Sequence, residues 1–376
     1  MTPGPTPVPA EILLSMASPI FHHRTPEFEA AVAEVKENLR YIFNTKNEVL
    51  LFASSGTGAM EGAIVNCFSS GDTVIVARNG KFGDREKQIA LTYGLKVIDL
   101  EYPWNQVVQT ADIARELDAN PNVRGVIVTQ SETSTGVLNP VKEIADLVRD
   151  REDCIIIVDS ITGIGAVECE TDDWGLDVVM TGSQKGLMLP PGLAAVSVSE
   201  KAWRAVEKST LPKFYFDWKK YRKSIDKNTT PFTPALTLIL GLDKALKMMK
   251  EEGRESIIER HSLLARATRA GVEAIGLELF APPEGRGSAV TPVWSPKGIE
   301  AGKIIKIMKE EYGVTITNGQ DDYKNRIFRI GHLGYFGPFD IITTLTALEM
   351  ALTTLGYAFE KGASIKAAEA VFLDAQ

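Results

Sequence analysis

Cysteine and histidine are scarce in this 376-residue chain, which has three cysteines and four histidines. Cys67, Cys154 and Cys169 are odd in number and lack the paired spacing of a zinc site, so a disulfide scaffold and a cysteine-bound metal are both disfavoured. His22 and His23 are adjacent, and two neighbouring residues of an extended segment cannot easily face one metal ion. We therefore expect no metal site.

Long hydrophobic runs and an excess of positive charge are also missing. No apolar run reaches the about 18 residues that a membrane-spanning helix needs, and residues 1–16 lack the basic and apolar regions of a secretory signal. With 41 Lys and Arg against 49 Asp and Glu, the net charge is −8, which offers no overall attraction for nucleic acid or anionic lipid. We expect a cytoplasmic protein that binds neither nucleic acid nor membranes, and its length favours two domains.

The glycine motifs of two large enzyme classes are absent as well. Gly56 and Gly58 begin a pattern like the dinucleotide-binding fingerprint, but the third glycine position holds Glu61. No GxxxxGK[ST] sequence occurs anywhere in the chain. Both observations count against a nicotinamide dehydrogenase and against a P-loop nucleoside triphosphatase.

What the chain does contain is a series of short apolar, β-branched runs in its first 200 residues. These runs are 49–54, 73–77, 96–100, 125–130, 155–160, 177–183 and 194–199. They are apolar at successive positions, which is typical of parallel strands that are covered on both faces. Helix-like segments of crossover length separate several of them, at 57–69, 82–93, 110–118 and 140–150. The alternation predicts an α/β domain whose mostly parallel sheet lies between helices.

The two ends of the chain follow other patterns. Residues 1–17 are rich in proline, which predicts an extended N-terminal arm that docks on a surface. Helical periodicity is expected at 234–250, 254–275, 300–312 and 338–356, and short strands at 277–280, 289–294, 314–317 and 327–332. This mixture predicts a smaller α+β domain near the C-terminus. We expect a large domain over residues 18–255 and a small domain over residues 256–376.

Lys185 is the first candidate for chemistry, in the segment TGSQKGLMLPPG directly after the predicted strand 177–183. Ligands bind at the carboxyl ends of strands in open α/β sheets, so a lysine held there is available as an amine nucleophile. A lysine in an arbitrary loop, by contrast, is usually solvated. The segment by itself leaves both interpretations open.

Two further segments point to a cofactor. Asp159 ends the apolar run 155–160, where it either caps a turn or serves as the counter-ion of a protonated ring nitrogen, because an unpaired buried carboxylate is costly. The segment SSGTGAMEG at 54–62 opens a predicted helix, whose free N–H groups form an anion site. A phosphate cradle, a buried acid and a lysine are together the groups needed to bind pyridoxal 5′-phosphate (PLP).

In combination, these segments resemble the class V aminotransferases of fold type I, and among them the alanine:glyoxylate and serine:glyoxylate (serine:pyruvate) aminotransferases. The matching motifs run from GPTPVP through SSGTGAMEG, NGKFGDR, SETSTGVLNP, VDSITGIGA, TGSQKGLMLPPG and NTTPFTP to FRIGHLG, and so cover nearly the whole chain. The resemblance implies the PLP-dependent fold type I, with a large domain and a smaller C-terminal α+β domain. It also implies a homodimer with a shared active site.

The resemblance implies roles for individual residues. Lys185 would be the Schiff-base lysine, Asp159 the partner of the pyridinium nitrogen, and Arg329 the residue that binds the substrate α-carboxylate. The other implied cofactor contacts are Ser55, Gly56, Thr57, Phe82, Thr133, Gln184 and Thr229. Two features depart from the family pattern. Phe82 stands where relatives often have a stacking tryptophan, and residues 226–228 lack the tyrosine that commonly reaches the phosphate from the neighbouring subunit.

We therefore expect a PLP-dependent aminotransferase that moves an amino group from alanine or serine to glyoxylate or pyruvate. Alternatives on the same fold are a lyase or desulfurase, although no cysteine follows Cys169, and an aspartate- or phosphoserine-type aminotransferase. A non-catalytic assembly subunit is a further alternative, which the intact Lys185, Asp159 and Arg329 disfavour. The sequence leaves open the preferred donor and acceptor, the pathway, the cross-subunit phosphate ligands and the role of Arg24.

Overall fold

The main sheet has seven strands in the order β1-β9-β8-β7-β4-β2-β3 in the computed structural model, which describes residues 1–375. The strands are β1 Glu48–Phe52, β2 Thr73–Arg78, β3 Lys96–Glu101, β4 Val123–Thr129, β7 Ile155–Asp159, β8 Val178–Gly182 and β9 Ala194–Val198. Strands β8, β7, β4, β2 and β3 are parallel, whereas β9 runs antiparallel to both β1 and β8. The predicted strands and the mostly parallel sheet are confirmed.

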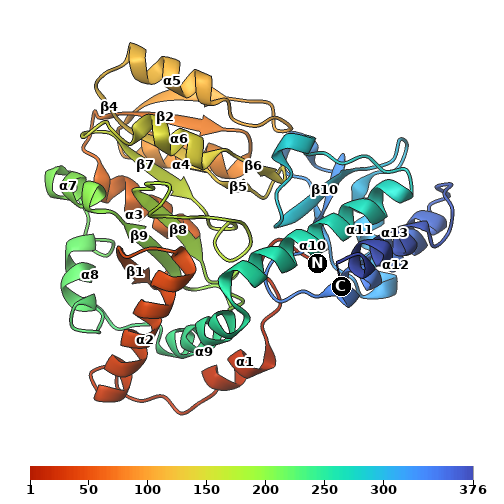
Figure 1. Cartoon of the computed structure of the whole chain (residues 1–376), viewed down its shortest axis with the longest axis horizontal. Helices are drawn as coiled ribbons and strands as arrows, with labels where there is room; N and C mark the ends of the chain where they lie inside the picture. Colours follow the sequence, from red (N-terminus) through yellow and green to blue (C-terminus); the bar gives the residue numbers. More distant parts are fainter. Residues whose placement is uncertain (376) are drawn as a thin grey trace.

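Helices cover both faces of this sheet (Figure 1). One face packs against α3 Gly56–Cys67, α4 Lys81–Thr92, α7 Glu200–Lys208 and α8 Trp218–Ile225. The other packs against α2 Pro26–Phe43, α5 Thr110–Ala119, α6 Val141–Val148 and α9 Leu236–Glu252. Side chains alternate between these layers, so that Ile127 packs with the first set of helices and Val126 and Val128 pack with the second. Burial on both sides explains why each strand is apolar at successive positions.

The N-terminal arm is shorter than expected. Residues 1–9 have no regular structure, and the prediction of an extended arm over residues 1–17 was wrong for α1, which spans Ala10–Met16. Pro9 lies at the N-cap, where the missing N–H of proline costs no helical hydrogen bond. Ile12 is fully buried in the core that α9 shares, so packing stabilises this short helix.

A second sheet, in the order β10-β12-β11, forms the centre of the C-terminal part. It consists of β10 Val290–Trp294, β11 Thr317–Asn318 and β12 Ile327–Gly331, with α11 Ala301–Tyr312, α12 Pro338–Thr354 and α13 Ala363–Leu373. All neighbouring strands in it are antiparallel. The predicted strand 277–280 was wrong, because that segment makes only a single bridge, from Leu279 to Val293.

Helix α10, Arg254–Ala274, connects the two sheets (Figure 1). Ile257 near its start belongs to the hydrophobic core of the large sheet, whereas Leu264 and Val272 belong to the core of the small one. We propose that the domain boundary lies near residue 256, where this helix leaves the large domain.

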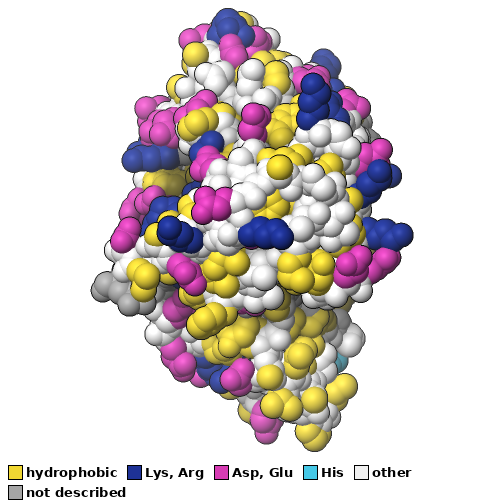
Figure 2. Space-filling model, turned by 90° about the vertical axis from the view of Figure 1, so that its right-hand side faces the viewer, with side chains coloured by type: hydrophobic (Ala, Val, Ile, Leu, Met, Phe, Trp, Pro, Cys, Tyr) yellow, Lys and Arg dark blue, Asp and Glu magenta, His cyan; other side chains and the backbone are white. Residues whose placement is uncertain are grey.

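The surface is mixed in character. The face on the right of Figure 1 carries Lys and Arg among Asp and Glu over its upper part, and more hydrophobic side chains over its lower part (Figure 2). Among residues 1–375, no helix combines the length and the apolar character that crossing a membrane requires.

Candidate active site

Lys185 lies in the loop between β8 and β9, at the carboxyl edge of the parallel strands. Its side chain is 8% exposed, and Nζ donates a hydrogen bond to the carbonyl oxygen of Pro3 in the N-terminal arm. The arm can approach this closely because residue 4 is glycine: a Cβ on Gly4, whose φ is +123°, would lie 2.6 Å from Nζ. Burial lowers the pKa of Lys185 to about 8, although the charge of Asp159 raises it. The neutral, nucleophilic amine is therefore more populated than in a solvated lysine.

Asp159 ends strand β7, and its side chain is buried. Oδ1 accepts a hydrogen bond of 2.8 Å from the backbone N–H of Ile161. Burial raises the pKa of Asp159 to about 7, and the charge of Glu132 raises it further, whereas the Ile161 N–H, Lys185 and Arg85 act in the opposite direction. The acid and the amine that the sequence singled out thus lie within electrostatic reach of each other.

The first turn of α3 forms a site for an anion. Ser55 at the N-cap makes no side-chain capping hydrogen bond, so backbone N–H groups of this turn remain for a ligand. Gly56 packs so closely on Ile161 that any side chain at position 56 would collide with it. Arg85 of α4 adds positive charge, because its Nη1 donates a 3.2 Å hydrogen bond to Oγ1 of Thr57. A helix dipole and a guanidinium both favour a phosphate here.

Gln184 directly precedes Lys185 in the same loop. Its Oε1 atom is buried and has no hydrogen-bond partner within residues 1–375, which is unusual for a buried polar atom. Its backbone carbonyl accepts a 3.1 Å hydrogen bond from the N–H of Thr6, and the Thr6 hydroxyl donates to the carbonyl of Lys185. The N-terminal arm therefore closes over the lysine loop and leaves the Gln184 amide for a ligand.

Arg329 reaches the site from β12 of the small domain. Its Nε donates to the carbonyl of Asn318 and its Nη1 to the carbonyl of Thr133, both at 2.9 Å. Burial lowers the pKa of Arg329 to about 10, and the charge of Glu132 opposes this effect. The two hydrogen bonds use only part of the guanidinium, so its other N–H groups can bind a carboxylate.

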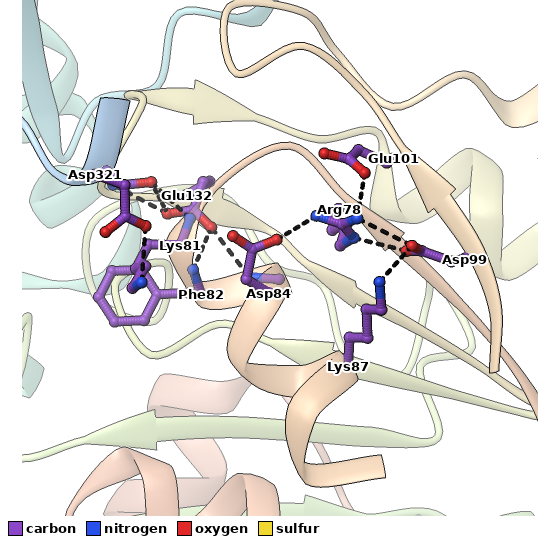
Figure 3. Close-up of polar contacts among 11 residues, drawn as sticks. Arg78, Lys81, Phe82, Asp84, Lys87, Asp99, Glu101, Glu132 and Asp321 are labelled. Atoms are coloured by element: carbon purple, nitrogen blue, oxygen red, sulfur yellow. Dashed lines mark hydrogen bonds and ion pairs between the residues drawn. The ribbon is translucent and has the colours of Figure 1, made fainter. Parts of the chain in front are cut away.

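Phe82 lies in the first turn of α4, whose start is fixed by Glu132 (Figure 3). Glu132 lies in the short hairpin of β5 Ser131–Glu132 and β6 Val137–Leu138. Its Oε2 accepts hydrogen bonds from the N–H groups of Phe82 and Gly83, at 2.9 and 3.2 Å, and its Oε1 accepts from Ser134. Burial raises the pKa of Glu132, whereas these hydrogen bonds lower it. Glu132 is a helix-capping residue that motif comparison missed.

A cluster of charges holds the outer side of α4 (Figure 3). Arg78, at the end of β2, pairs with Asp84 of α4 at 2.5 Å and with Asp99 of β3 at 2.6 Å, and it also contacts Glu101. Lys87, one turn further along α4, pairs with Asp99 at 2.6 Å. The hydrogen bonds to Asp99 are the main cause that raises the pKa of Arg78. The helix that carries Phe82 and Arg85 is therefore anchored on two sides.

The two domains also meet beside α4. Lys81 pairs with Asp321 at 2.7 Å, in the 3₁₀ turn η2 (Asp321–Tyr323) of the small domain. Trp104 of the large domain stacks on Tyr323, with ring centres 5.4 Å apart. A cavity of about 510 Å³ opens between these groups. An ion pair and an aromatic stack thus join the domains next to the site.

Most of the residues singled out in the sequence come together at one edge of the large sheet. These are Lys185, Asp159, Gln184, Ser55, Gly56, Thr57, Phe82, Thr133 and Arg329. Thr229 lies apart from them and accepts a 2.5 Å hydrogen bond from Arg24 at the surface. Arg85 is a further cation in the site: its guanidinium carbon is 5.0 Å from the centre of the Phe82 ring. The motif NGKFGDR contains Arg85, but its charged residues look solvated in the sequence.

Comparison with known proteins gives matches along the whole chain. A family model described as aminotransferase class-V matches residues 13–324. The small subunit of a soluble hydrogenase from a Synechococcus species is 47% identical over 99% of this chain and 97% of its own length. An L-aspartate–glyoxylate aminotransferase from Paracoccus denitrificans is 35% identical, over 98% and 94%. A serine–glyoxylate aminotransferase from Methylorubrum extorquens is 33% identical, over 97% and 94%.

A solved structure matches equally broadly. The crystal structure of ureidoglycine–glyoxylate aminotransferase from Bacillus subtilis superimposes with a TM-score of 0.95 and 29% sequence identity. The match covers 99% of this chain and 97% of that one, and so includes both domains and the residues around Lys185.

Proposed function

The chain belongs to the aminotransferase class-V family, and from this premise we propose that it is a PLP-dependent aminotransferase acting on small amino acids. The donor is alanine or serine and the acceptor is glyoxylate or pyruvate. The observation that carries the proposal is the buried amine of Lys185, which lies within electrostatic reach of Asp159 and Arg329. An amine, an acid and a carboxylate-binding arginine are the groups that this reaction needs.

The residues present fit PLP. The first turn of α3 and Arg85 offer N–H groups and positive charge to a phosphate. In the loop beside Lys185, the buried Oε1 of Gln184 has no partner among residues 1–375, and we propose the Gln184 amide as a further contact of the cofactor. Lys185 offers a primary amine to the aldehyde, and Asp159 offers a carboxylate to the ring nitrogen. When bound, PLP supplies a ring that withdraws electrons from the α-carbon of an amino acid.

Each protein group then has a defined task. With PLP and substrate bound, Nζ of Lys185 would leave the carbonyl of Pro3, take the proton from the substrate α-carbon and deliver it to the former aldehyde carbon of PLP. A pKa of about 8 suits this task, because a base works best when its pKa lies near the working pH. Asp159 holds a proton at the ring nitrogen, and Arg329 orients the substrate through its α-carboxylate.

The uptake of PLP should report the state of the Lys185 amine. We expect the rate of PLP binding to the cofactor-free protein to rise with pH through about 8, because the neutral amine reacts and burial lowers the pKa of Lys185 to about 8. Stopped-flow absorbance over a pH series measures this rate. A rate that keeps rising through the usual lysine pKa of 10.5, with no inflection near 8, would contradict the assignment.

A preference for small substrates follows from where the cations lie. Arg329 can bind one carboxylate, but a dicarboxylic substrate needs a second cation at the far end of the site. Two other arginines are engaged elsewhere: Arg85 donates a hydrogen bond to Thr57 in the anion site, and Arg24 donates one to Thr229 at the surface. The charge arrangement therefore supports alanine and serine as donors.

A substrate panel tests this preference. With glyoxylate as the acceptor, we expect kcat/KM for aspartate and glutamate to be about 10²-fold lower than for alanine and serine, because the side-chain carboxylate of these donors would be buried without a cation. Product oxo acids are measured under one set of conditions, with Arg24→Ala tested in parallel. If aspartate is the best donor, the small-substrate proposal is wrong. Loss of aspartate activity alone in Arg24→Ala would then assign the second carboxylate to Arg24.

We also propose that the enzyme is a homodimer with a shared site. Phe214 is 72% exposed and Tyr215 39%, so aromatic surface is available for a second copy of the chain. Thr229 and Arg24 lie at the surface rather than beside Lys185, which suits a contribution to the site of the other subunit. A non-catalytic role as an assembly subunit is less well supported, because it requires no buried amine.

A further inference from the structure

Glu86 is a buried acid on α4 to which the proposed chemistry assigns no task. It lies between Gly83 and Ala90 on the face of α4 that packs inward. Its side chain is 1% exposed, and neither carboxyl oxygen has a hydrogen-bond partner within residues 1–375. A charged carboxylate in such surroundings is strongly disfavoured unless something compensates it.

Helix α4 covers the same face of the sheet to which Asp159 points. The core on this face contains Ile127 of β4 and Ile157 of β7 together with Ala90 of α4. Because side chains alternate along a strand, the residues two positions further, Thr129 and Asp159, point to this face as well. They are direct neighbours in the ladder between β4 and β7.

Thr129, like Glu86, is buried without a hydrogen-bond partner for its side chain: its hydroxyl oxygen has none in the described part of the chain. Glu86 from the helix and Thr129 and Asp159 from the sheet are therefore buried polar residues in the same layer between α4 and the sheet, and we call these three residues the acid pocket. Of the three, Asp159 is the member with a backbone donor, the N–H of Ile161.

Glu86 cannot easily turn away from the acid pocket, because α4 is held in place on both sides of it (Figure 3). Glu132 caps the start of the helix through Phe82 and Gly83. The residues two before and one after Glu86, Asp84 and Lys87, are anchored by Arg78 and Asp99. The rotation of the helix, and with it the inward direction of Glu86, is therefore fixed.

The charges around Glu86 decide which acid ionises. Asp159 faces it from β7, and Arg85 is its neighbour on α4. Other charged groups on elements packed against α4 are engaged. Glu61 of α3 accepts a hydrogen bond from Tyr93, and Arg78 of β2 binds its three acids. Glu132 of β5 accepts hydrogen bonds from the start of α4 and from Ser134. Burial raises the pKa of Glu86, the charge of Asp159 raises it further, and Arg85 opposes both. Two carboxylates in one dry pocket cannot both be charged, and the one with a backbone donor ionises first.

We propose that Glu86 is a positioning residue. Of the two carboxyl groups in the acid pocket, that of Glu86 keeps its proton and stays neutral, so that Asp159 carries the negative charge. The catalytic half of this proposal rests on the proposed function, since an ionised Asp159 is what holds a proton at the ring nitrogen of PLP. The protonation of Glu86 itself does not depend on PLP and can be tested separately.

Thermal unfolding over a pH series tests the protonation. A glutamate that keeps its proton when folded and loses it when unfolded reduces stability as pH rises above its usual pKa of 4.5, whereas glutamine has no proton to lose. We therefore expect the Tm of full-length Glu86→Gln, relative to the unaltered protein, to increase by about 2 °C or more between about pH 5 and about pH 8. The exposed Glu259 provides the control, and Glu259→Gln should show no such trend. A difference that is constant or falls with pH would show that Glu86 is charged and would overturn the proposal.

The role toward Asp159 needs a second pair of variants. Glu86→Gln keeps a neutral donor, and we expect kcat within about threefold of the unaltered protein, whereas Glu86→Leu should lose about tenfold. The ¹⁵N NMR shift of ¹⁵N-labelled PLP should indicate a protonated ring nitrogen in the first variant and move toward the unprotonated value in the second. An equal loss of kcat in Glu86→Gln and Glu86→Leu would overturn the proposal. Failure to bind PLP at all would refute the proposed function instead and would leave the unfolding result valid.

Discussion

Lys185→Ala is expected to abolish amino-group transfer, with kcat reduced by about 10⁴ or more. The variant loses both the nucleophile that reacts with PLP and the base that moves the α-proton, and general-base catalysis alone contributes about 10² to 10⁴. The fold should persist, because the substitution removes one buried amine and its hydrogen bond to Pro3 and at the same time relieves the burial of a charged group. Amino-transfer assays and circular dichroism measure the two effects.

The control for this variant is Lys201→Ala. Lys201 is also a largely buried lysine, with a side chain 15% exposed, but it lies on α7 and donates to the carbonyl of Val148, away from the site. Its loss should leave kcat unchanged. Borohydride treatment of the protein with PLP, followed by peptide mapping, should label Lys185, and a label on any other lysine would refute the assignment.

Asp159→Asn is expected to reduce kcat by about 10³ while PLP remains bound. An amide cannot hold the proton of the ring nitrogen, so the negative charge that develops at the α-carbon loses its stabilisation, and the loss of one such interaction costs about 10² to 10³ in rate. The phosphate contacts of the first α3 turn are untouched, which is why binding should survive. Steady-state kinetics and the absorbance of bound PLP give the two results.

Asp177→Asn is the matched control. Asp177 is a buried aspartate too, but it accepts hydrogen bonds from Ile156 N–H and Ser199 at the opposite end of the sheet. We expect this variant to lower the Tm with little change in kcat. If Asp159→Asn turns over at a near-normal rate, Asp159 does not have the proposed role.

The fold could be predicted from the sequence where local pattern and burial agree. The strands of the large sheet are apolar at successive positions, and both faces are indeed covered. The reversal of β9 was not predictable, because Ala194–Val198 is as uniformly buried as its parallel neighbours and nothing in such a run encodes direction. Helix α1 was missed because the prolines before it dominate the local pattern, while its stability comes from the burial of Ile12.

The candidate site also contains residues that could be predicted from the sequence and residues that could not. Lys185 and Asp159 could be found because each follows an apolar strand, where ligands bind. Glu86 and Arg85 could not, because the run Asp84–Lys87 looks like a solvated helix surface. The inward face of α4 is built from Gly83 and Ala90 rather than from large apolar residues, so its periodicity is weak. The spacing of the small residues Gly83 and Ala90 was the one feature of the sequence that could have indicated the buried face of α4.

The N-terminal arm acts as a tether between the halves of the site. At one end the carbonyl of Met1 accepts a hydrogen bond from Gly331, two residues after Arg329, and at the other Thr6 bonds to Gln184 and Lys185. Five residue steps span at most about 18 Å when fully extended. As long as both ends hold, the strand bearing Arg329 cannot separate further than this from the lysine loop. The carboxylate-binding group therefore stays at high effective concentration relative to the amine, whatever motion the two domains make.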